Sequence, residues 1–285
     1  MNQGRSNNPM DKKKVIVLSV AGSDSSAGAG IQADIKTISA LDGYAATAIT
    51  AVTVQNTLGV QGVHPLPAEL VGRQMEAVME DLRPDAVKIG MTGNEAIIGE
   101  IADVLRRYPV RHVVFDSVMV STSGHKLMTD EAIDAIRTRL LPMVSLVTPN
   151  LHEAEVLLRQ PVRTVDDMEC AARQLCEEFR CACLVKGGHL EGNDMCDVFY
   201  DGRELHLFAA GRIHTENLHG TGCTLSSAIA TFLAQGFPMY EAVELAKTYI
   251  TKVIEAGKDL HIGQGNGPLW HFLYPMNPMN PAGEE

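Results

Sequence analysis

Residues 219–236 read HGTGCTLSSAIATFLAQG, a glycine-rich turn that leads directly into an apolar segment. The apolar residues recur at three- and four-residue intervals, as in an amphipathic helix: Leu225, Ala228, Ile229, Phe232 and Leu233. The first turn of a helix leaves backbone N–H groups without partners, and glycines let a ligand approach them closely. We therefore predict an anion-binding loop formed by Gly220, Thr221 and Gly222 at the start of this helix.

Cys223 follows that loop at the predicted helix N-terminus. The positive end of a helix stabilises a thiolate, which would act as a base or a nucleophile. A cysteine at this position can equally be a small buried apolar residue. The local sequence leaves both interpretations open.

Outward from this stretch, short β-branched segments alternate with helical patterns, which predicts an α/β fold with a mainly parallel sheet. Buried parallel strands are expected at residues 15–20, 47–54, 86–90, 112–117, 145–149 and 182–187. Residues 196–200 and 204–208 flank Asp201-Gly202, a typical hairpin sequence, and predict an antiparallel pair near an edge. Further helices are predicted from two apolar sets: Ile31, Ile35 and Ile38, then Val243, Ala246, Ile250 and Val253.

The length and polarity of the segments predict one domain. Residues 14–275 carry the α/β pattern, whereas residues 1–13 and 276–285 are polar or rich in Pro and Asn and are expected to be a disordered N-terminal tail and a loose C-terminal tail. No internal repeat interrupts the pattern. The 285-residue chain is 45% hydrophobic, enough for one large core.

Charge and cysteine content limit the function classes. The net charge is −11, without a basic stripe, which argues against a nucleic-acid partner. No apolar run reaches the roughly 20 residues of a membrane helix, so no membrane partner is expected. The six cysteines form no CxxC pair, which favours a reducing cytoplasm. Residues 11–22 resemble a short signal peptide but lack a small-residue cleavage pattern.

In a parallel sheet, ligands bind beyond the carboxyl ends of the strands, so the residues after each strand are candidates. After the first strand, residues 28–33 read GAGIQA and match a dinucleotide fingerprint. That fingerprint also needs an acidic residue after the second strand, and the sequence has none there. We therefore reject a nicotinamide site, and we expect Asp24 to close an Asx turn.

Four further strand ends carry candidate residues. The amide of Gln55 offers a donor and an acceptor to a neutral heteroaromatic ring, and Met91 would cover a flat ring; a loop cap and a core filler are the alternatives. Asn150 and Glu153 have the spacing of a capping box, or they hold water around Mg²⁺. Lys186, before two glycines, offers a charge to phosphate or lies in solvent. The chain has no GxxxxGK[ST] sequence, so we expect residues 220–223 to bind phosphate in place of a P-loop.

Seven segments together resemble the hydroxymethylpyrimidine/phosphomethylpyrimidine kinases of the ribokinase-like superfamily: AGSDSSAGAGIQADIKTISAL, ITAVTVQNT, KIGM, DSVMV, TPNLHEAE, KGGH and HGTGCT. They run in order through residues 14–272. The resemblance implies a three-layer α/β/α fold with a mainly parallel sheet and a small antiparallel edge hairpin. It also implies a homodimer that uses ATP and Mg²⁺ to phosphorylate 4-amino-5-hydroxymethyl-2-methylpyrimidine, and then its monophosphate, in thiamine biosynthesis.

The resemblance further implies a role for each matching residue. The pyrimidine pocket would contain Gly22, Asp34, Gln55, Met91 and Val118. The nucleotide side would contain Asn150, Glu153 and Lys186, with magnesium held by Glu153 and, through water, by Asn150. Gly220, Thr221 and Gly222 would form the anion hole, and Cys223 would occupy the position where most of the superfamily carries an aspartate base.

Several positions depart from the pattern of these kinases. Ser25 and Ala27 stand where Pro and Gly are common, Ser117 stands where Pro is usual, and Leu218 stands where Thr is usual. The SDSS loop also resembles that of related pyridoxal kinases, so a pyridoxal kinase is the alternative function. Gln55 favours the pyrimidine because its amide can read a ring nitrogen and an exocyclic amine. A non-catalytic binding protein with Cys223 as a sensor thiol is a third possibility.

Overall fold

The computed structural model describes residues 14–119, 128–188 and 194–273. Within these residues, one nine-stranded sheet has the order β3-β2-β1-β4-β5-β6-β7-β8-β9. The strands are β1 (Ile16–Asp24), β2 (Tyr44–Asn56), β3 (Gly59–Pro65), β4 (Ala86–Ile89), β5 (His112–Phe115), β6 (Leu146–Val147), β7 (Ala182–Val185), β8 (Asp194–Tyr200) and β9 (Leu205–Gly211). The pairings β2–β3, β7–β8 and β8–β9 are antiparallel and the others are parallel. The predicted mainly parallel sheet and its edge hairpin at residues 196–208 are confirmed.

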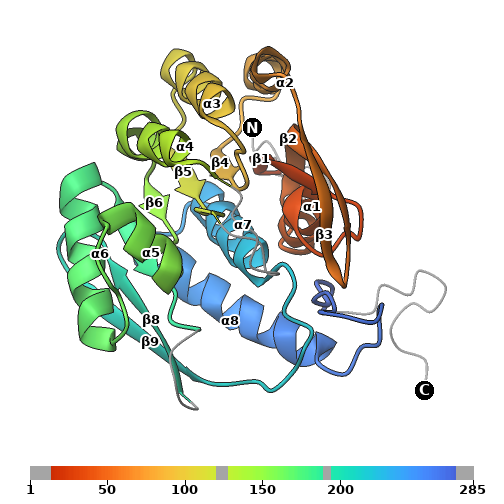
Figure 1. Ribbon diagram of the computed structural model, residues 1–285, viewed down its shortest axis with the longest axis vertical. Coiled ribbons are helices and arrows are strands. Elements are labelled where there is room, and N and C mark those ends of the chain that lie inside the picture. Colours follow the sequence, from red (N-terminus) through yellow and green to blue (C-terminus); the bar gives the residue numbers. More distant parts are fainter. Residues whose placement is uncertain (1–13, 120–127, 189–193, 274–285) are drawn as a thin grey trace, which may run out of the picture.

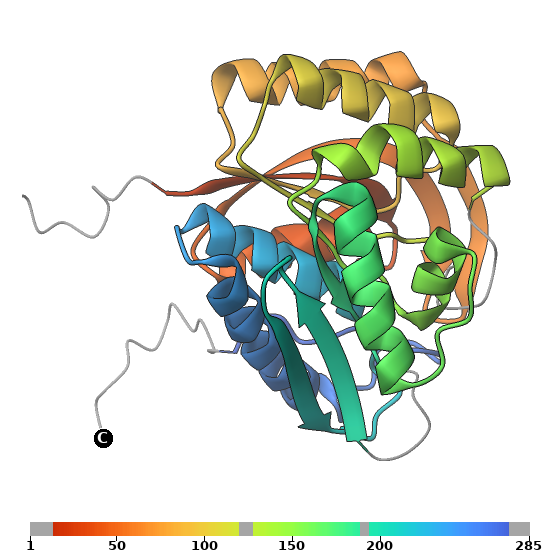
Figure 2. The same ribbon diagram turned by 90° about the vertical axis from the view of Figure 1, so that its left-hand side faces the viewer.

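Helices cover both faces of this sheet, as Figure 1 shows. One face carries α1 (Gly30–Ala40), α7 (Thr221–Ala234) and α8 (Met239–Gly257), and the other carries α2 (Ala68–Asp81), α3 (Glu95–Arg107), α4 (Asp130–Ala135), α5 (Leu151–Leu158) and α6 (Val165–Phe179). A short π-helix, Ile136–Leu140, and a 3-10 helix, Leu141–Met143, follow α4. The view turned by 90° shows the same three layers, which confirms the predicted α/β/α architecture (Figure 2).

The alternating direction of strand side chains produces one apolar core on each face. Val17 of β1 packs with α7 and α8, whereas its neighbour Leu18 packs with the helices of the opposite face. Both side chains are fully buried. This double burial is the reason that the central strands are apolar at consecutive positions rather than at alternate ones.

The β2–β3 edge differs from the prediction. β3 was not predicted, because its sequence GVQGVHP contains two glycines and ends in proline, which is unusual inside a sheet but acceptable at an edge. The second predicted strand was also expected to be buried throughout. Instead, Val52 and Val54 are 45% and 48% exposed while Thr53 between them is buried, because only one face of β2 is covered here.

Two helices also differ in which residues they bury. Ile35 was predicted to face the core but is 38% exposed, and Asp34 and Thr37 are buried in α1 in its place. The helix α7 was predicted to be amphipathic, yet its polar residues Ser227 and Thr231 are fully buried. The reason is its central position, since it contacts α1 and α8 as well as β1, β4 and β5.

The predicted tails, residues 1–13 and 276–285, lie outside the described residues. Among the helices that the structure describes, none combines the length and the apolar character needed to cross a membrane.

Candidate active site

The carboxyl ends of the parallel strands all lie at the same end of the sheet. The chain runs from β1 outward to β2 and β3 and then returns to β4 on the other side of β1, so the strand order reverses between β1 and β4. Ligands of such sheets bind at this reversal. Gly22 and Met91 meet there: a Cβ on Gly22 would lie 3.4 Å from the Met91 sulfur. Two of the residues predicted for the pyrimidine pocket are therefore adjacent.

The predicted anion-binding loop lies at the start of α7. Gly220 is the N-cap residue of this helix, has a left-handed backbone with φ of 90°, and supplies no side-chain cap. A Cβ at Gly220 would clash with the carbonyl oxygen of Gly28, so only glycine fits here. The loop after β1 and the loop before α7 thus lie in direct contact. An uncapped first turn leaves backbone N–H groups to be satisfied by an anion.

A buried ion pair faces this loop. Lys186, just after β7, donates from Nζ to Asp116 Oδ1 over 2.9 Å, and Asp116 lies just after β5. A Cβ on Gly222 would lie 3.3 Å from Asp116 Oδ2 and 3.4 Å from Lys186 Nζ, so the absence of a side chain brings the loop close to both charges. Burial opposes the ionised form of Asp116, but Lys186 and Lys88 outweigh it and lower its pKa.

Asp116 was not singled out in the sequence. The signal was present, since Asp116 is the first charged residue after the apolar strand β5, at the edge where ligands are expected. The predicted strand, residues 112–117, includes Asp116, whereas β5 ends at Phe115 and leaves Asp116 just beyond the strand end.

The predicted capping box at the start of α5 is confirmed. Asn150 Oδ1 accepts from Glu153 N at 2.9 Å, and Glu153 Oε2 accepts from Asn150 N at 2.8 Å. Ser117 Oγ also donates to Glu153 Oε2, at 3.3 Å. Burial raises the pKa of Glu153 to about 7 against the opposing charge of Lys186, and Asp116 adds to the rise. The capping role does not remove Glu153 from the site, because its carboxyl group lies within the field of the Asp116–Lys186 pair.

A second ion pair lies beneath the site and is fully buried. Lys88 Nζ donates to both oxygens of Asp34 at 2.9 Å, and the hydroxyls of Ser19 and Ser227 donate to the same carboxylate at 2.5 and 2.7 Å. Burial disfavours the charged form of Lys88, but Asp34 reverses the effect and raises its pKa. Asp34 was predicted to line the pyrimidine pocket. In this structure its carboxylate is 0% exposed and occupied by protein donors.

Cys223 lies in the first turn of α7, close to both buried ion pairs, and its side chain is partly exposed. Burial raises the pKa of its thiol to about 11, while Lys88 opposes the rise and Asp34 and Asp116 add to it. Burial and the two carboxylates thus oppose the stabilisation that the helix N-terminus and Lys88 offer to a negative charge on this sulfur.

Gln55 belongs to a third group of polar side chains, at the ends of β1 and β2. Its Nε2 lies 3.1 Å from His219 Nε2, which lies 2.9 Å from Asp24 Oδ2. The predicted Asx turn at Asp24 is confirmed, since Ser26 N donates to Asp24 Oδ1 at 2.8 Å. A small cavity of about 30 Å³ lies beside Gln55 and His219. His219 was not predicted as a site residue, although it is the first residue of the glycine-rich stretch 219–236.

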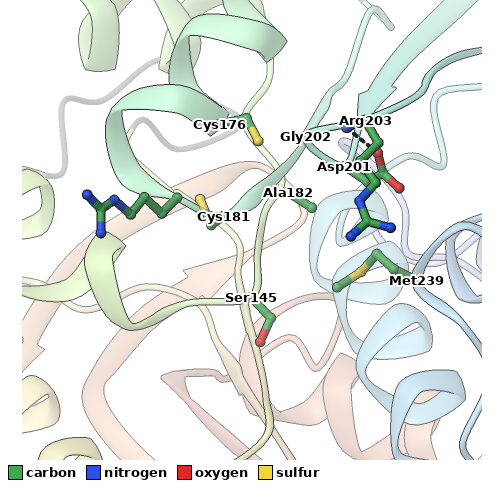
Figure 3. Close-up of a pocket in the computed structure, with 9 residues that line it drawn as sticks. Ser145, Cys176, Cys181, Ala182, Asp201, Gly202, Arg203 and Met239 are labelled. Atoms are coloured by element: carbon green, nitrogen blue, oxygen red, sulfur yellow. Dashed lines mark hydrogen bonds between the residues drawn. The ribbon is translucent and has the colours of Figure 1, made fainter.

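The remaining predicted residue, Val118, lies two residues after Asp116 and is half-buried, with its N–H donating to Asp116 O at 2.8 Å. A larger cavity of about 570 Å³ lies elsewhere. It is lined by residues near the starts of β6, β7 and α8, including Ser145, Ala182 and Met239 (Figure 3). None of the predicted site residues lines it, because they follow the opposite ends of the strands.

The chemistry of the Asp116–Lys186–Glu153 group suits a nucleotide with magnesium. Among the described residues, no three His, Cys, Asp or Glu side chains are arranged to hold a metal ion alone. Magnesium needs no such cluster, because it is commonly held by one or two carboxylates together with phosphate and water. Asp116 and Glu153 could supply the carboxylates, and Lys186 with the glycine loop could supply positive charge for phosphate.

Comparison with known proteins identifies the family of this chain. The family model described as phosphomethylpyrimidine kinase matches residues 24–270. The chain belongs to the phosphomethylpyrimidine kinase family. A hydroxymethylpyrimidine/phosphomethylpyrimidine kinase of Rhizobium meliloti is 51% identical over 90% of this chain and 97% of its own length.

Solved structures show the same relationship. The phosphomethylpyrimidine kinase of Clostridium difficile has a TM-score of 0.76 and 41% identity, covering 85% of this chain and all of that one. The pyridoxal kinase of Staphylococcus aureus in complex with AMP-PCP and pyridoxal has a TM-score of 0.82 and 33% identity, covering 93% and 96%. The fold of this phosphomethylpyrimidine kinase family member is thus shared with kinases of a second aromatic alcohol.

Proposed function

We propose that the protein transfers the γ-phosphoryl group of ATP to the hydroxyl of 4-amino-5-hydroxymethyl-2-methylpyrimidine, and then to the resulting monophosphate, in thiamine biosynthesis. One observation carries the proposal. The uncapped, glycine-rich N-terminus of α7 lies against the Asp116–Lys186 pair, with Cys223 in the same helical turn. The names of relatives at 42–51% identity support the choice of substrate.

Positioning and charge stabilisation account for most of phosphoryl-transfer catalysis, because the transition state is loose and its charge lies on the equatorial oxygens. Here the backbone N–H groups of Gly222 and Cys223 and the Lys186 ammonium would stabilise that charge. A bound magnesium ion would neutralise phosphate charge, held beside Asp116 and Glu153. The role of Lys186 follows from its place at the loop, 3.4 Å from the point that a Cβ on Gly222 would occupy.

Cys223 is the proposed base for the hydroxyl proton. Its pKa of about 11 means that the thiol carries a proton near neutral pH. A base that collects its proton late in the reaction needs only a small thiolate population, and this population grows with pH. The pH dependence of turnover therefore tests the role directly.

For the substrate ring, we assign Gln55 to the polar edge and Met91 to one face, with Gly22 leaving room beside Met91. Asp34 would act indirectly, through Lys88 and Ser227. The test is an ADP-release assay with ATP, magnesium and each alcohol in turn. We expect turnover with the pyrimidine alcohol and its monophosphate, and much weaker turnover with pyridoxal.

A pyridoxal kinase is the second candidate, favoured by the SDSS loop. Ser25 Oγ donates to Gln55 O at 2.7 Å and accepts from Gln55 N at 3.0 Å, so this loop directly contacts the residue proposed to read the ring. Preferred turnover of pyridoxal would establish that alternative. Binding of the pyrimidine without turnover of either alcohol would favour a binding or thiol-sensing protein instead.

Three further proposals concern the whole protein. We propose a homodimer, supported by the exposed apolar residues Val52, Val54 and Leu58 at the β2–β3 edge. We propose a single kinase domain over residues 14–275. A cytoplasmic location is supported by the six cysteines, all of which are described and free. Light scattering on the purified protein tests the dimer.

A further inference from the structure

The side chain of His219 connects two loops through one ring nitrogen. Its Nε2 lies 2.9 Å from Asp24 Oδ2 and 3.1 Å from the Gln55 side-chain amide. Both His219 and Asp24 are buried. A ring nitrogen with one proton cannot donate to a carboxylate and also accept from an amide N–H, so the protons in this group can be assigned.

The hydrogen bonds of Asp24 determine which nitrogen of His219 carries the proton. Asp24 Oδ2 already accepts from the backbone N–H groups of Gly28 and Ala29, at 3.0 and 2.8 Å. Burial alone would raise the pKa of Asp24, but the hydrogen bonds from His219, Ser26 and Ala29 lower it to about 2. An ionised carboxylate only accepts, so His219 Nε2 carries a proton and donates it to Asp24.

The contacts of Thr53 determine the orientation of the Gln55 amide independently. Thr53 Oγ1 lies 3.3 Å from Gln55 Oε1. The Thr53 hydroxyl donates its single proton to Ser23 O at 3.0 Å. Thr53 can therefore only accept from Gln55. Both neighbours require the same orientation, in which the NH2 group of Gln55 donates to Thr53 and the carbonyl oxygen of Gln55 shares the Nε2 proton of His219 with Asp24. This is the orientation reached by a 180° rotation of the amide group.

We propose that His219 and Thr53 are positioning residues that hold the Gln55 amide in this single orientation, so that it recognises an aminopyrimidine edge. The second N–H of Gln55 then donates to a ring nitrogen, and the second lone pair of its oxygen accepts from the neighbouring exocyclic amine. The inference rests on the proposed function, because it takes Gln55 as the residue that reads the substrate ring.

The packing around His219 supports a fixed side chain. A Cβ on Gly28 would clash with the imidazole ring, so the loop after β1 lies directly against it. The backbone N–H of His219 also donates to Gly267 O at 3.1 Å. The ring is therefore held from the backbone and from its Nε2, which leaves it little freedom to release Gln55.

The test compares His219→Leu, His219→Gln and Thr53→Val with the wild type. Each variant is assayed with the pyrimidine alcohol and with the analogue that lacks the 4-amino group. For His219→Leu and Thr53→Val we expect KM for the pyrimidine alcohol to rise about tenfold, kcat to change less than about threefold, and the preference for the amino substrate to fall about tenfold. His219→Gln, which keeps a donor, should retain most of the preference. His64→Leu, an exposed histidine on β3, is the matched control.

The same substitutions on a Gln55→Leu background complete the test. There they should have no further effect on KM, because the amide that they orient is absent. Additive effects on KM in the Gln55→Leu background would overturn the inference and leave the proposed function intact. The same holds if His219→Leu and Thr53→Val both keep an unchanged preference for the amino substrate. Absence of turnover by the wild type would instead refute the proposed function, and the inference with it.

Discussion

The rate of phosphoryl transfer should rise with pH because the thiol of Cys223 is protonated at neutral pH. Burial and the carboxylates of Asp34 and Asp116 raise its pKa from an ordinary 9.0 to about 11, against Lys88. At pH 8 this reduces the thiolate fraction about 100-fold relative to an unperturbed cysteine, because each pKa unit changes the ratio tenfold. If the thiolate is the base, kcat should increase about tenfold per pH unit between pH 7 and 9.

The assay is kcat for ADP release at saturating ATP, magnesium and pyrimidine alcohol. Cys223→Asp tests the assignment, because an aspartate is ionised throughout this range and should flatten the profile. Cys223→Ala should lower kcat at least about 100-fold, as expected for the loss of a general base. A flat wild-type profile from pH 7 to 9, or full activity of Cys223→Ala, would refute the reasoning. Exposed Cys170 makes Cys170→Ala the control.

The other predictions concern the elements that hold the site. Lys88→Met should lower the free energy of unfolding by about 3–5 kcal/mol, because it leaves the buried carboxylate of Asp34 without its cation. Urea unfolding measures this loss, and the double variant Lys88→Met/Asp34→Leu should recover part of it. Gly220→Ala should lower kcat/KM for ATP more than tenfold through a strained left-handed backbone and a clash with Gly28, and unchanged kinetics would contradict the anion-loop assignment. Asp24 has a lowered pKa, so it stabilises the fold above about pH 4 and loses this effect as pH falls toward 2. Asp24→Asn should cost about 1–2 kcal/mol at pH 7, and its Tm should converge with that of the wild type in acid.

Local patterns predicted the features that depend on neighbours in the chain. The capping box of Asn150 and Glu153, the Asx turn at Asp24, and the hairpin at Asp201-Gly202 are each set by residues within a few positions of one another. The glycine loop before α7 was visible for the same reason. The family resemblance extended this to the order of the motifs and to the three-layer fold.

Features that depend on distant residues were missed or predicted wrongly. The edge strand β3 is defined by its antiparallel pairing with β2, and its glycines and proline carry no strand signal of their own. The buried polar face of α7 requires α1, α8 and the sheet to surround it. Lys88 was visible in the apolar strand 86–90, but its partner Asp34 lies 54 positions away.

The sequence by itself determined the alternation of strands and helices, the position of the glycine loop at a helix N-terminus, and the family. These depend on periodicity, turn chemistry and short motifs, which act over a few residues. Only the tertiary structure decided the surroundings of Cys223, the burial of Asp34 and the contact between His219 and Gln55. Burial and electrostatic interaction act through space, and the fold brings these groups together from strands and loops that are far apart in the chain.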